Sequence, residues 1–233
     1  MATKPILFNT EMVRAILDGR KSCTRRLVKP EPQGYFEVSE EPLYIYDTDG
    51  KQGKITPPYQ PGDILYVRET FAWCPCWDCG MDTEQGACTD HIYHSEKKEY
   101  GCYMYRASCE DNEYPSADTW HPSIHMPKEA ARIWLKVKNV RVERLQEMKP
   151  VDVIKEGAYP DCWDCLNTYE ESGSQCCYGT EEQCSQCDGV MMEWEKLWNS
   201  TIKKTDIDRY GWDANPWVWV IEFERCKKPK GEN

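Results

Sequence analysis

The stretch formed by residues 216–225 constrains the fold more than any other part of this 233-residue chain. It carries large apolar side chains at successive positions and not only at every second one. Two tryptophans, an isoleucine and a phenylalanine share one side, and two valines share the other: Trp217, Trp219, Ile221 and Phe223, then Val218 and Val220. A strand with two apolar faces has to be covered on both sides. We therefore predict a strand that closes a β-barrel and does not lie at a sheet edge.

Hydrophobic periodicity predicts the remaining elements. We expect strands at residues 5–8, 64–68, 133–142 and 216–225. We expect helices at residues 10–17, 150–156 and around 191–198. The alternation of the long third strand slips by one residue at Asn139, which indicates a bulge or bend. Trp194 and Trp198 have helical spacing and are expected in the core. The pattern predicts a mainly β protein with peripheral helices, an α+β class in which the strands form a barrel.

A basic segment follows the first predicted helix, which ends at Gly19. Five cations fall within ten residues, and no acid lies among them: Arg20, Lys21, Arg25, Arg26 and Lys29. The hydroxyl of Thr24 lies three residues after Lys21. Such a cluster suits a polyanion or a nucleotide-like ligand whose phosphate is held by charge. A solvated basic turn after a helix is the alternative interpretation.

The net charge of −11 is unevenly distributed along the chain. Residues 76–118 hold ten acids and three bases, and residues 161–196 hold nine acids and one base. The rest of the chain therefore carries about +4. The overall acidity does not argue against a nucleic-acid ligand, because the local field around the basic segment is what steers a ligand to it.

Several blocks of the sequence resemble the ASCH domain, a small β-barrel related to the PUA domain of RNA-modifying proteins. The first is the signature Gly19-x-Lys21-x-x-Thr24-x-Arg26. The others, similar to a phage and prophage branch of the family, are residues 4–19, 61–70, 121–145 and 210–223. The resemblance implies one PUA-like ASCH domain over residues 1–233, with two cysteine-rich segments inserted at about 74–118 and 160–189.

Fourteen cysteines in a chain that starts without a secretory signal favour metal binding over a disulfide framework. Two Cys-x2-Cys pairs, with 18 residues between them, have the spacing of a zinc ribbon. The expected ligands are Cys162, Cys165, Cys184 and Cys187. Four thiolates from two such turns form the closed tetrahedral site of a structural zinc. Cys176 and Cys177 lie between the pairs and are alternatives for one ligand.

A second zinc site is expected in the first cysteine-rich segment, where residues 76–79 have the same Cys-Trp-Asp-Cys sequence as residues 162–165. The expected ligands are Cys76, Cys79, Cys88 and Cys102, with His91 as the competing ligand. A joint site that uses both Cys-Trp-Asp-Cys turns is the alternative. Both segments are acidic and poor in aliphatics, so metal would supply their folding free energy. A catalytic, deaminase-type zinc is disfavoured, because its His-x-Glu motif is missing upstream.

The first functional hypothesis is a binding module. A PUA-like barrel would hold RNA, DNA or a modified nucleoside in a basic cleft, between residues 21–26 and the end of the strand in residues 61–69. The residues expected to contact the ligand are Arg20, Lys21, Arg25, Arg26, Arg68 and Trp217. Cations meet phosphate, and an aromatic ring stacks on a base. For Trp217, core packing is the alternative role.

The second hypothesis is an enzyme. Some ASCH relatives hydrolyse the amide of N-acetylated cytidine with a Lys, a Thr and a Glu, and the resemblance implies Lys21, Thr24 and Glu69 for these roles. The lysine would take the threonine proton, Thr24 would attack the amide carbonyl, and Glu69 would orient the lysine. An ion pair of Glu69 with Arg68 or Lys21 is the structural alternative. A phage structural or assembly protein is a third hypothesis, and it needs no such cluster.

No apolar run is long enough to span a membrane, and the first residues lack the apolar region of a signal peptide. We therefore expect no membrane partner and a cytoplasmic location, in a bacterial or phage-infected cell.

Overall fold

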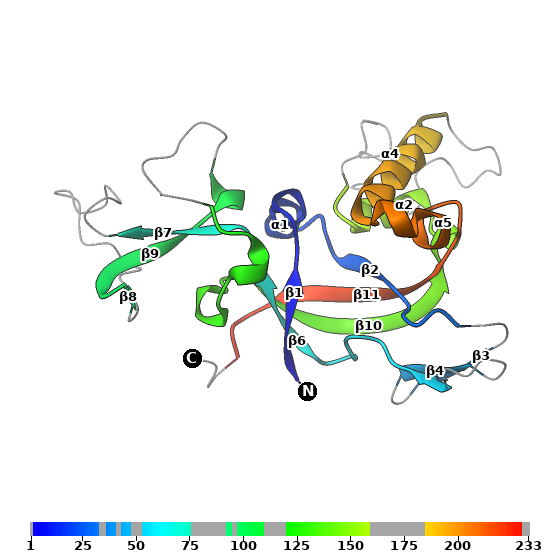
Figure 1. Ribbon diagram of the computed structural model, residues 1–233, viewed down its shortest axis with the longest axis horizontal. Helices are drawn as coiled ribbons and strands as arrows, with labels where there is room; N and C mark the ends of the chain where they lie inside the picture. The colour runs from blue at the N-terminus through cyan, green and yellow to red at the C-terminus, as the bar shows by residue number, and fades with distance from the viewer. Residues whose placement is uncertain are drawn as a thin grey trace. The chain divides into compact units, whose positions relative to one another are not determined.

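The computed structural model describes residues 2–32, 36–40, 43–47, 53–75, 92–94, 97–109, 120–158 and 185–229. Its strands are β1 (Thr3–Leu7), β2 (Cys23–Leu27), β3 (Phe36–Glu40), β4 (Leu43–Asp47), β5 (Gly53–Ile55), β6 (Ile64–Arg68), β7 (Phe71–Pro75), β8 (Ile92–His94), β9 (Glu99–Tyr105), β10 (Trp134–Arg144) and β11 (Trp217–Cys226). Its α-helices are α1 (Thr10–Leu17), α2 (Pro150–Lys155), α4 (Ser185–Thr201) and α5 (Ile207–Tyr210). Short 3-10 turns lie at Arg106–Ser108, Ser123–His125, Lys128–Ala130, Leu145–Glu147 and Lys204–Asp206. Figure 1 shows these elements.

The described strands form three sheets, so the expected mainly β class with a few helices is confirmed. The largest sheet has the order β1-β6-β10-β11-β2, and the smaller ones have the orders β3-β4-β5 and β7-β9-β8. In the described part of the chain the order of the large sheet is open, from β1 to β2. The closed barrel therefore stays a prediction.

By its contacts the chain divides into two compact units. The first unit comprises Met1–Ala2, Ala15–Ile64 and Lys136–Arg225, and the second comprises Thr3–Arg14, Leu65–Leu135 and Cys226–Asn233. Each unit is assembled from distant parts of the sequence. That the whole chain is one ASCH-type domain stays a prediction.

The first unit is built on β11 and the helices beside it. Val218 and Val220 pack against residues of α2 and α4, where Val153, Trp194 and Trp198 are buried. The side chains on the other face of β11 are also almost inaccessible: Trp219, Ile221 and Phe223. The expected burial of β11 on both faces is confirmed, as is the core position of the two helical tryptophans. The helices α2 and α4 can be followed next to each other in Figure 1.

The start of the chain follows its local sequence signals. The helix α1 is capped by Asn9, whose side-chain oxygen accepts a hydrogen bond of 2.8 Å from the amide of Met12. Gly19 ends the helical segment with a φ of +79°, a value that suits glycine at this position. In β10, Leu135 and Val137 are buried two residues apart, Lys138 and Asn139 are both exposed, and burial resumes at Val140, so the expected slip at Asn139 is present.

The second unit contains the sheet β7-β9-β8, which lies within the first cysteine-rich segment and the residues before it. Phe71, Ala72, Trp73 and Cys74 are all buried in β7. The register places Trp73 opposite Tyr103, and Cys74 opposite Cys102. Residues 76–91, 95–96, 110–119 and 159–184, which make up most of the two cysteine-rich segments, lie outside the described residues.

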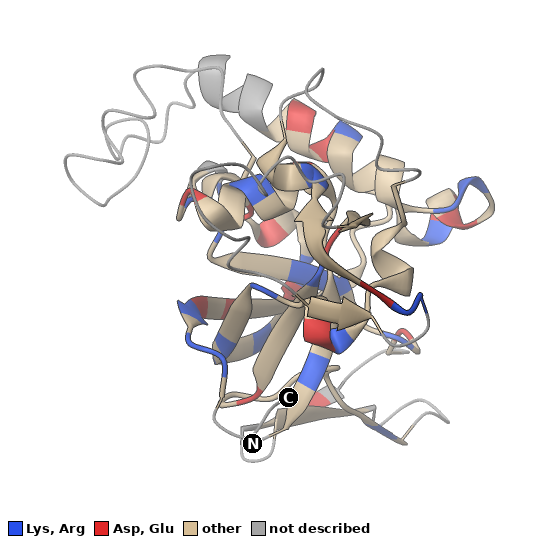
Figure 2. Ribbon diagram, turned by 90° about the vertical axis from the view of Figure 1, so that its left-hand side faces the viewer, with Lys and Arg blue, Asp and Glu red and all other residues tan. Residues whose placement is uncertain are grey.

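Acidic and basic residues are mixed along the described strands and helices (Figure 2). Exposed ion pairs join several of them, for example Lys138 to Glu224 at 3.3 Å. Within the described ranges, no helix is long and apolar enough to cross a membrane.

Candidate functional site

The basic segment is tied to the end of α1 before it enters β2. The backbone amides of Arg20 and Lys21 both donate to the carbonyl of Ala15, at 2.9 and 3.0 Å. The amide of Ser22 donates to the carbonyl of Lys155, at the end of α2. These bonds direct the Lys21 side chain into the space between β2 and α2.

Lys21 is fully buried. Its ammonium lies 2.7 Å from the carbonyl oxygen of Cys23, 2.7 Å from the carbonyl oxygen of Glu156 and 2.8 Å from the Glu156 carboxylate oxygen Oε2. The three acceptors match the three N–H donors of a lysine ammonium. Lys21 is therefore held in one position by partners on two different elements.

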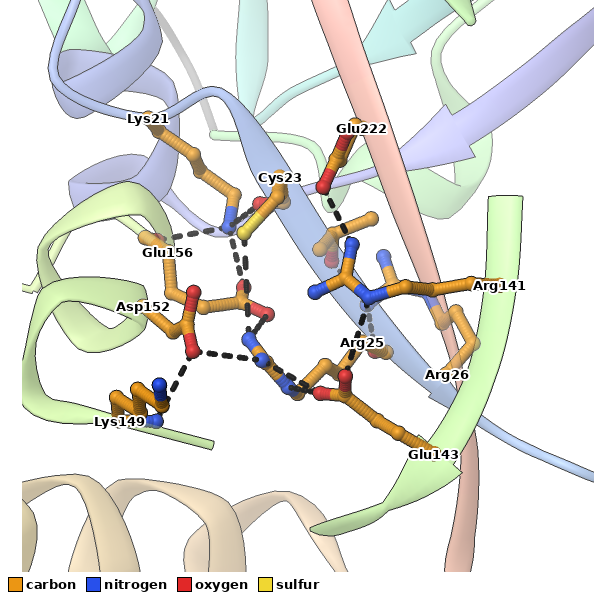
Figure 3. A network of polar contacts seen from close by, with 11 residues as sticks. Lys21, Cys23, Arg25, Arg26, Arg141, Glu143, Lys149, Asp152, Glu156 and Glu222 are labelled. Carbon is orange, nitrogen blue, oxygen red and sulfur yellow. Dashed lines mark hydrogen bonds and ion pairs between the residues drawn. The ribbon is translucent and has the colours of Figure 1, made fainter. Parts of the chain in front are cut away.

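Arg25 is buried beside Lys21 and shares its carboxylate partner. Its guanidinium contacts Glu156 Oε1 at 3.1 Å and Glu143 Oε1 at 2.7 Å, with Asp152 at 3.7 Å. Burial alone would lower the pKa of Arg25, but the negative charges of Glu156 and Glu143 outweigh it and raise this pKa. Figure 3 shows Lys21, Arg25 and Glu156 pointing toward one another.

The loop after α2 brings Glu156 this close. Gly157 has a φ of +86°, and a Cβ atom there would lie 2.7 Å from the Ala15 Cβ and 2.9 Å from the Lys21 Cβ. Only glycine satisfies both conditions without displacement of these neighbours. The Arg20 guanidinium donates to the carbonyl of Gly157 at 3.1 Å. The polypeptide therefore packs Glu156 directly against the basic segment.

Cys23 lies in the same buried cluster. Burial, followed by the negative charge of Glu156, raises the pKa of its thiol from 9.0 to about 12. The thiolate is the nucleophilic form of cysteine. At neutral pH Cys23 is therefore an inert thiol and not a nucleophile.

The cluster extends outward through Glu143. Arg141 pairs with the other Glu143 oxygen at 3.1 Å and also contacts Glu222, and about a third of the Arg141 side chain is exposed. Alternating cations and carboxylates therefore connect the buried Lys21 to the partly exposed Arg141 (Figure 3).

Thr24 and Arg26 occupy the opposite face of β2, because successive side chains of a strand alternate. A nitrogen of the Arg26 guanidinium donates to the Thr24 hydroxyl at 2.9 Å and to the carbonyl of Arg25 at 3.1 Å. Burial lowers the pKa of Arg26, and burial also raises the pKa of the nearby Tyr59. The Thr24 hydroxyl and the Lys21 ammonium therefore bind different partners.

Trp217 lies on the same face as Arg26, since Val28 pairs with Trp217 and Arg26 pairs with Trp219. Trp217 is half-buried, and the Arg144 guanidinium lies over its ring, 4.2 Å from the centroid. A guanidinium stacked on an indole is stabilised by the negative face of the ring.

Glu69 and Arg68 belong to the second unit. The buried Glu69 carboxylate accepts two hydrogen bonds from Arg132, both 2.9 Å long. The Arg132 guanidinium in turn lies 4.0 Å from the centroid of the Tyr105 ring. Arg68 donates to the carbonyl of Ile124. The carboxylate that pairs with Lys21 is that of Glu156, and the trio of Lys21, Thr24 and Glu69 stays a prediction.

Glu156 and Glu143 are site residues that the sequence did not lead us to expect. The local signals for them are weak: Glu156 precedes a glycine that ends a helix, and Glu143 lies among the cations of a long strand. Neither signal names Lys21 or Arg25 as the partner, because the contact joins residues 135 positions apart.

The expected zinc ligands fall mostly outside the described residues: Cys76, Cys79, Cys88, Cys162, Cys165 and Cys184. Cys187 lies in the first turn of α4, and Cys102 lies in β9. Among the residues that the structure does describe, no group of three or more His, Cys, Asp or Glu is arranged to hold a metal ion. Both zinc sites therefore stay predictions.

Comparisons with known proteins add no relative: no family model, curated protein or solved structure matches this chain.

Proposed function

We propose that the chain is an ASCH-type, PUA-like module that binds nucleic acid or a modified nucleoside at the end of the β2–β11 pair where the partly exposed Arg26 and Trp217 share one face. The observation that carries the proposal is the alternation of β2. Arg25 faces α2 and is held by carboxylates, while Arg26 lies on the opposite face, across from the buried Trp219 and near the half-buried Trp217. An arginine and an aromatic ring on one surface suit a phosphate and a base.

The buried charges support this proposal, because their desolvation costs folding free energy. Lys21 and Arg25 have side chains with 0% exposure, and Glu156 has 1%. The free energy lost by desolvation of buried charges largely cancels their attraction. Apolar side chains of similar volume would therefore stabilise the fold as well or better. Such polar clusters are typical of functional regions. We infer that Lys21 and Arg25 position β2, and that Arg26 and Trp217 contact the ligand.

Arg26→Gln tests the proposal against Lys138→Gln, which removes an exposed cation of the same unit. Binding of a single-stranded RNA is measured over a series of salt concentrations. Arg26→Gln is expected to weaken binding and to lower the slope of log K against log salt by about one, for one lost phosphate contact. Lys138→Gln should leave both quantities unchanged. Equal slopes for the wild type and Arg26→Gln would count against this face.

The alternative function is hydrolysis of the amide of N-acetylated cytidine. The observation that bears on it is the buried pair of Lys21 and Glu156, 2.8 Å apart. The Thr24 hydroxyl accepts a hydrogen bond from Arg26 instead, so this mechanism requires Thr24 to leave Arg26 and turn toward Lys21. Here Glu156 would orient the lysine in place of Glu69. Acetate release from N-acetylcytidine by the purified chain tests this alternative, and Lys21→Ala should abolish the activity. A chain that neither binds nor hydrolyses would rule out both functions and leave the function to the cysteine-rich segments.

A further inference from the structure

The second unit contains a cavity lined by none of the residues of the proposed binding face or of the buried Lys21–Glu156 cluster. It has a volume of about 470 Å³ and is lined by the sheet β7-β9-β8 and by residues of the segment 121–129. Two backbone hydrogen bonds tie that segment to β7: the amide of Phe71 donates to His121, and the amide of His121 donates to Phe71. The volume falls within the roughly 300–1,000 Å³ of small-molecule sites.

The floor of the cavity is aromatic and rigid. Trp73 and Phe71 are buried, and the Tyr103 ring meets both edge-on, with centroids 5.2 and 6.0 Å away. The Trp73 indole N–H donates to Glu99 at 2.9 Å, which fixes the ring. A Cβ atom at Gly101 would lie 2.4 Å from the Trp73 ring, so the indole rests directly on the backbone of β9.

The rim of the cavity is polar and more exposed. Among the described residues that line it, the rim carries Lys97, the imidazoles of His94, His121 and His125, and the carboxylate of Glu129. The carboxylate of Glu99, opposite His94 on β9, already accepts the hydrogen bond of the Trp73 indole. The Nδ1 atom of His94 accepts a hydrogen bond of 3.3 Å from the amide of Lys97, so the His94 proton lies on Nε2. Lys97 and the N–H groups of the three imidazoles are hydrogen-bond donors at this rim. They suit an anion that also accepts hydrogen bonds.

We propose that this cavity binds a nucleotide. The purine or pyrimidine ring lies against the aromatic floor and beside Tyr93, and the phosphate lies at Lys97 and the imidazoles. Bases stack on the rings of Phe, Tyr, Trp and His in this manner, and their phosphates are met by cations. The nucleotide comes either as a free mononucleotide or as one unit of a single strand. The site is separate from the face of β2 and does not depend on the function proposed there.

Calorimetric titrations of the full chain test the proposal, with 5′-AMP, adenosine and a five-nucleotide single strand as probes. Tyr93→Ala and Lys97→Gln alter the cavity. Their controls are Tyr46→Ala and Lys98→Gln: Tyr46 in β4 is 50% exposed, close to the 53% of Tyr93, and neither Tyr46 nor Lys98 lines the cavity. Loss of a base–aromatic stack weakens binding about fivefold or more.

The expected result is that 5′-AMP binds, that adenosine binds at least about fivefold more weakly for want of the phosphate, and that only the two cavity variants reduce the affinity. The same variant pattern with the pentanucleotide alone assigns the site to a single strand. Arg26→Gln should leave 5′-AMP binding intact, which separates this site from the one on β2. The proposal is overturned if the wild type binds neither 5′-AMP nor the pentanucleotide, or if the wild type and Tyr93→Ala bind with equal affinity.

Discussion

Replacing Glu156 by glutamine tests the buried cluster most directly. The Glu156 carboxylate accepts a hydrogen bond of 2.8 Å from Lys21 and one of 3.1 Å from Arg25, and all three side chains are at most 1% exposed. In Glu156→Gln the amide oxygen still accepts from one cation, but the NH₂ group faces the other. Two buried cations then lose the negative charge that they share.

The magnitude follows from the burial of both partners. Removal of one member of a buried ion pair typically costs about 3–5 kcal/mol, because the remaining charge stays desolvated without compensation. Glu224→Gln is the control on β11, since Glu224 pairs with Lys138 at 3.3 Å with both side chains about half exposed. Exposed pairs of this kind contribute about 0–1 kcal/mol.

Urea unfolding followed by fluorescence of the buried tryptophans measures the free energy of unfolding of each variant. The double variant Lys21→Met/Glu156→Leu removes a cation together with the carboxylate. It should therefore be more stable than Glu156→Gln alone, although it changes more atoms. A loss below about 1 kcal/mol in Glu156→Gln would falsify the argument that burial makes this cluster costly to break.

Three further predictions concern the same chain. Gly157→Ala should destabilise the protein by about 1–3 kcal/mol more than Gly19→Ala in thermal melts, because both positions have positive φ but only Gly157 lacks room for a Cβ atom. Since the pKa of Cys23 is raised from 9.0 to about 12, folding stability should fall as the pH rises from 9 toward 12, where only the unfolded chain releases this proton, and the decline should be smaller in Cys23→Val. Elemental analysis should find at least one zinc per chain in protein never exposed to chelator, and Cys184→Ser should lower that content; wild-type protein with less than one zinc would contradict the ribbon.

The sequence by itself determined the elements whose formation depends on residues close together in the chain. Periodicity over a few residues places α1 and its end at Gly19, and it shows that β11 is apolar on both faces. Spacing of three and four residues likewise identifies Trp194 and Trp198 as the buried side of α4. Each of these patterns depends on backbone geometry within one element, which the sequence alone reveals.

The site was decided by tertiary structure. The sequence shows that Lys21 and Arg25 are cations in a basic segment, which favours contact with a ligand, but the fold buries both against Glu156. Likewise, Glu69 pairs with Arg132, 63 residues later in the chain. A charged side chain is exposed in most proteins, so only the placement of another element shows which carboxylate neutralises it. Such pairs depend on strand order and register, because a register shift of one residue would exchange the sheet faces on which Arg25 and Arg26 lie.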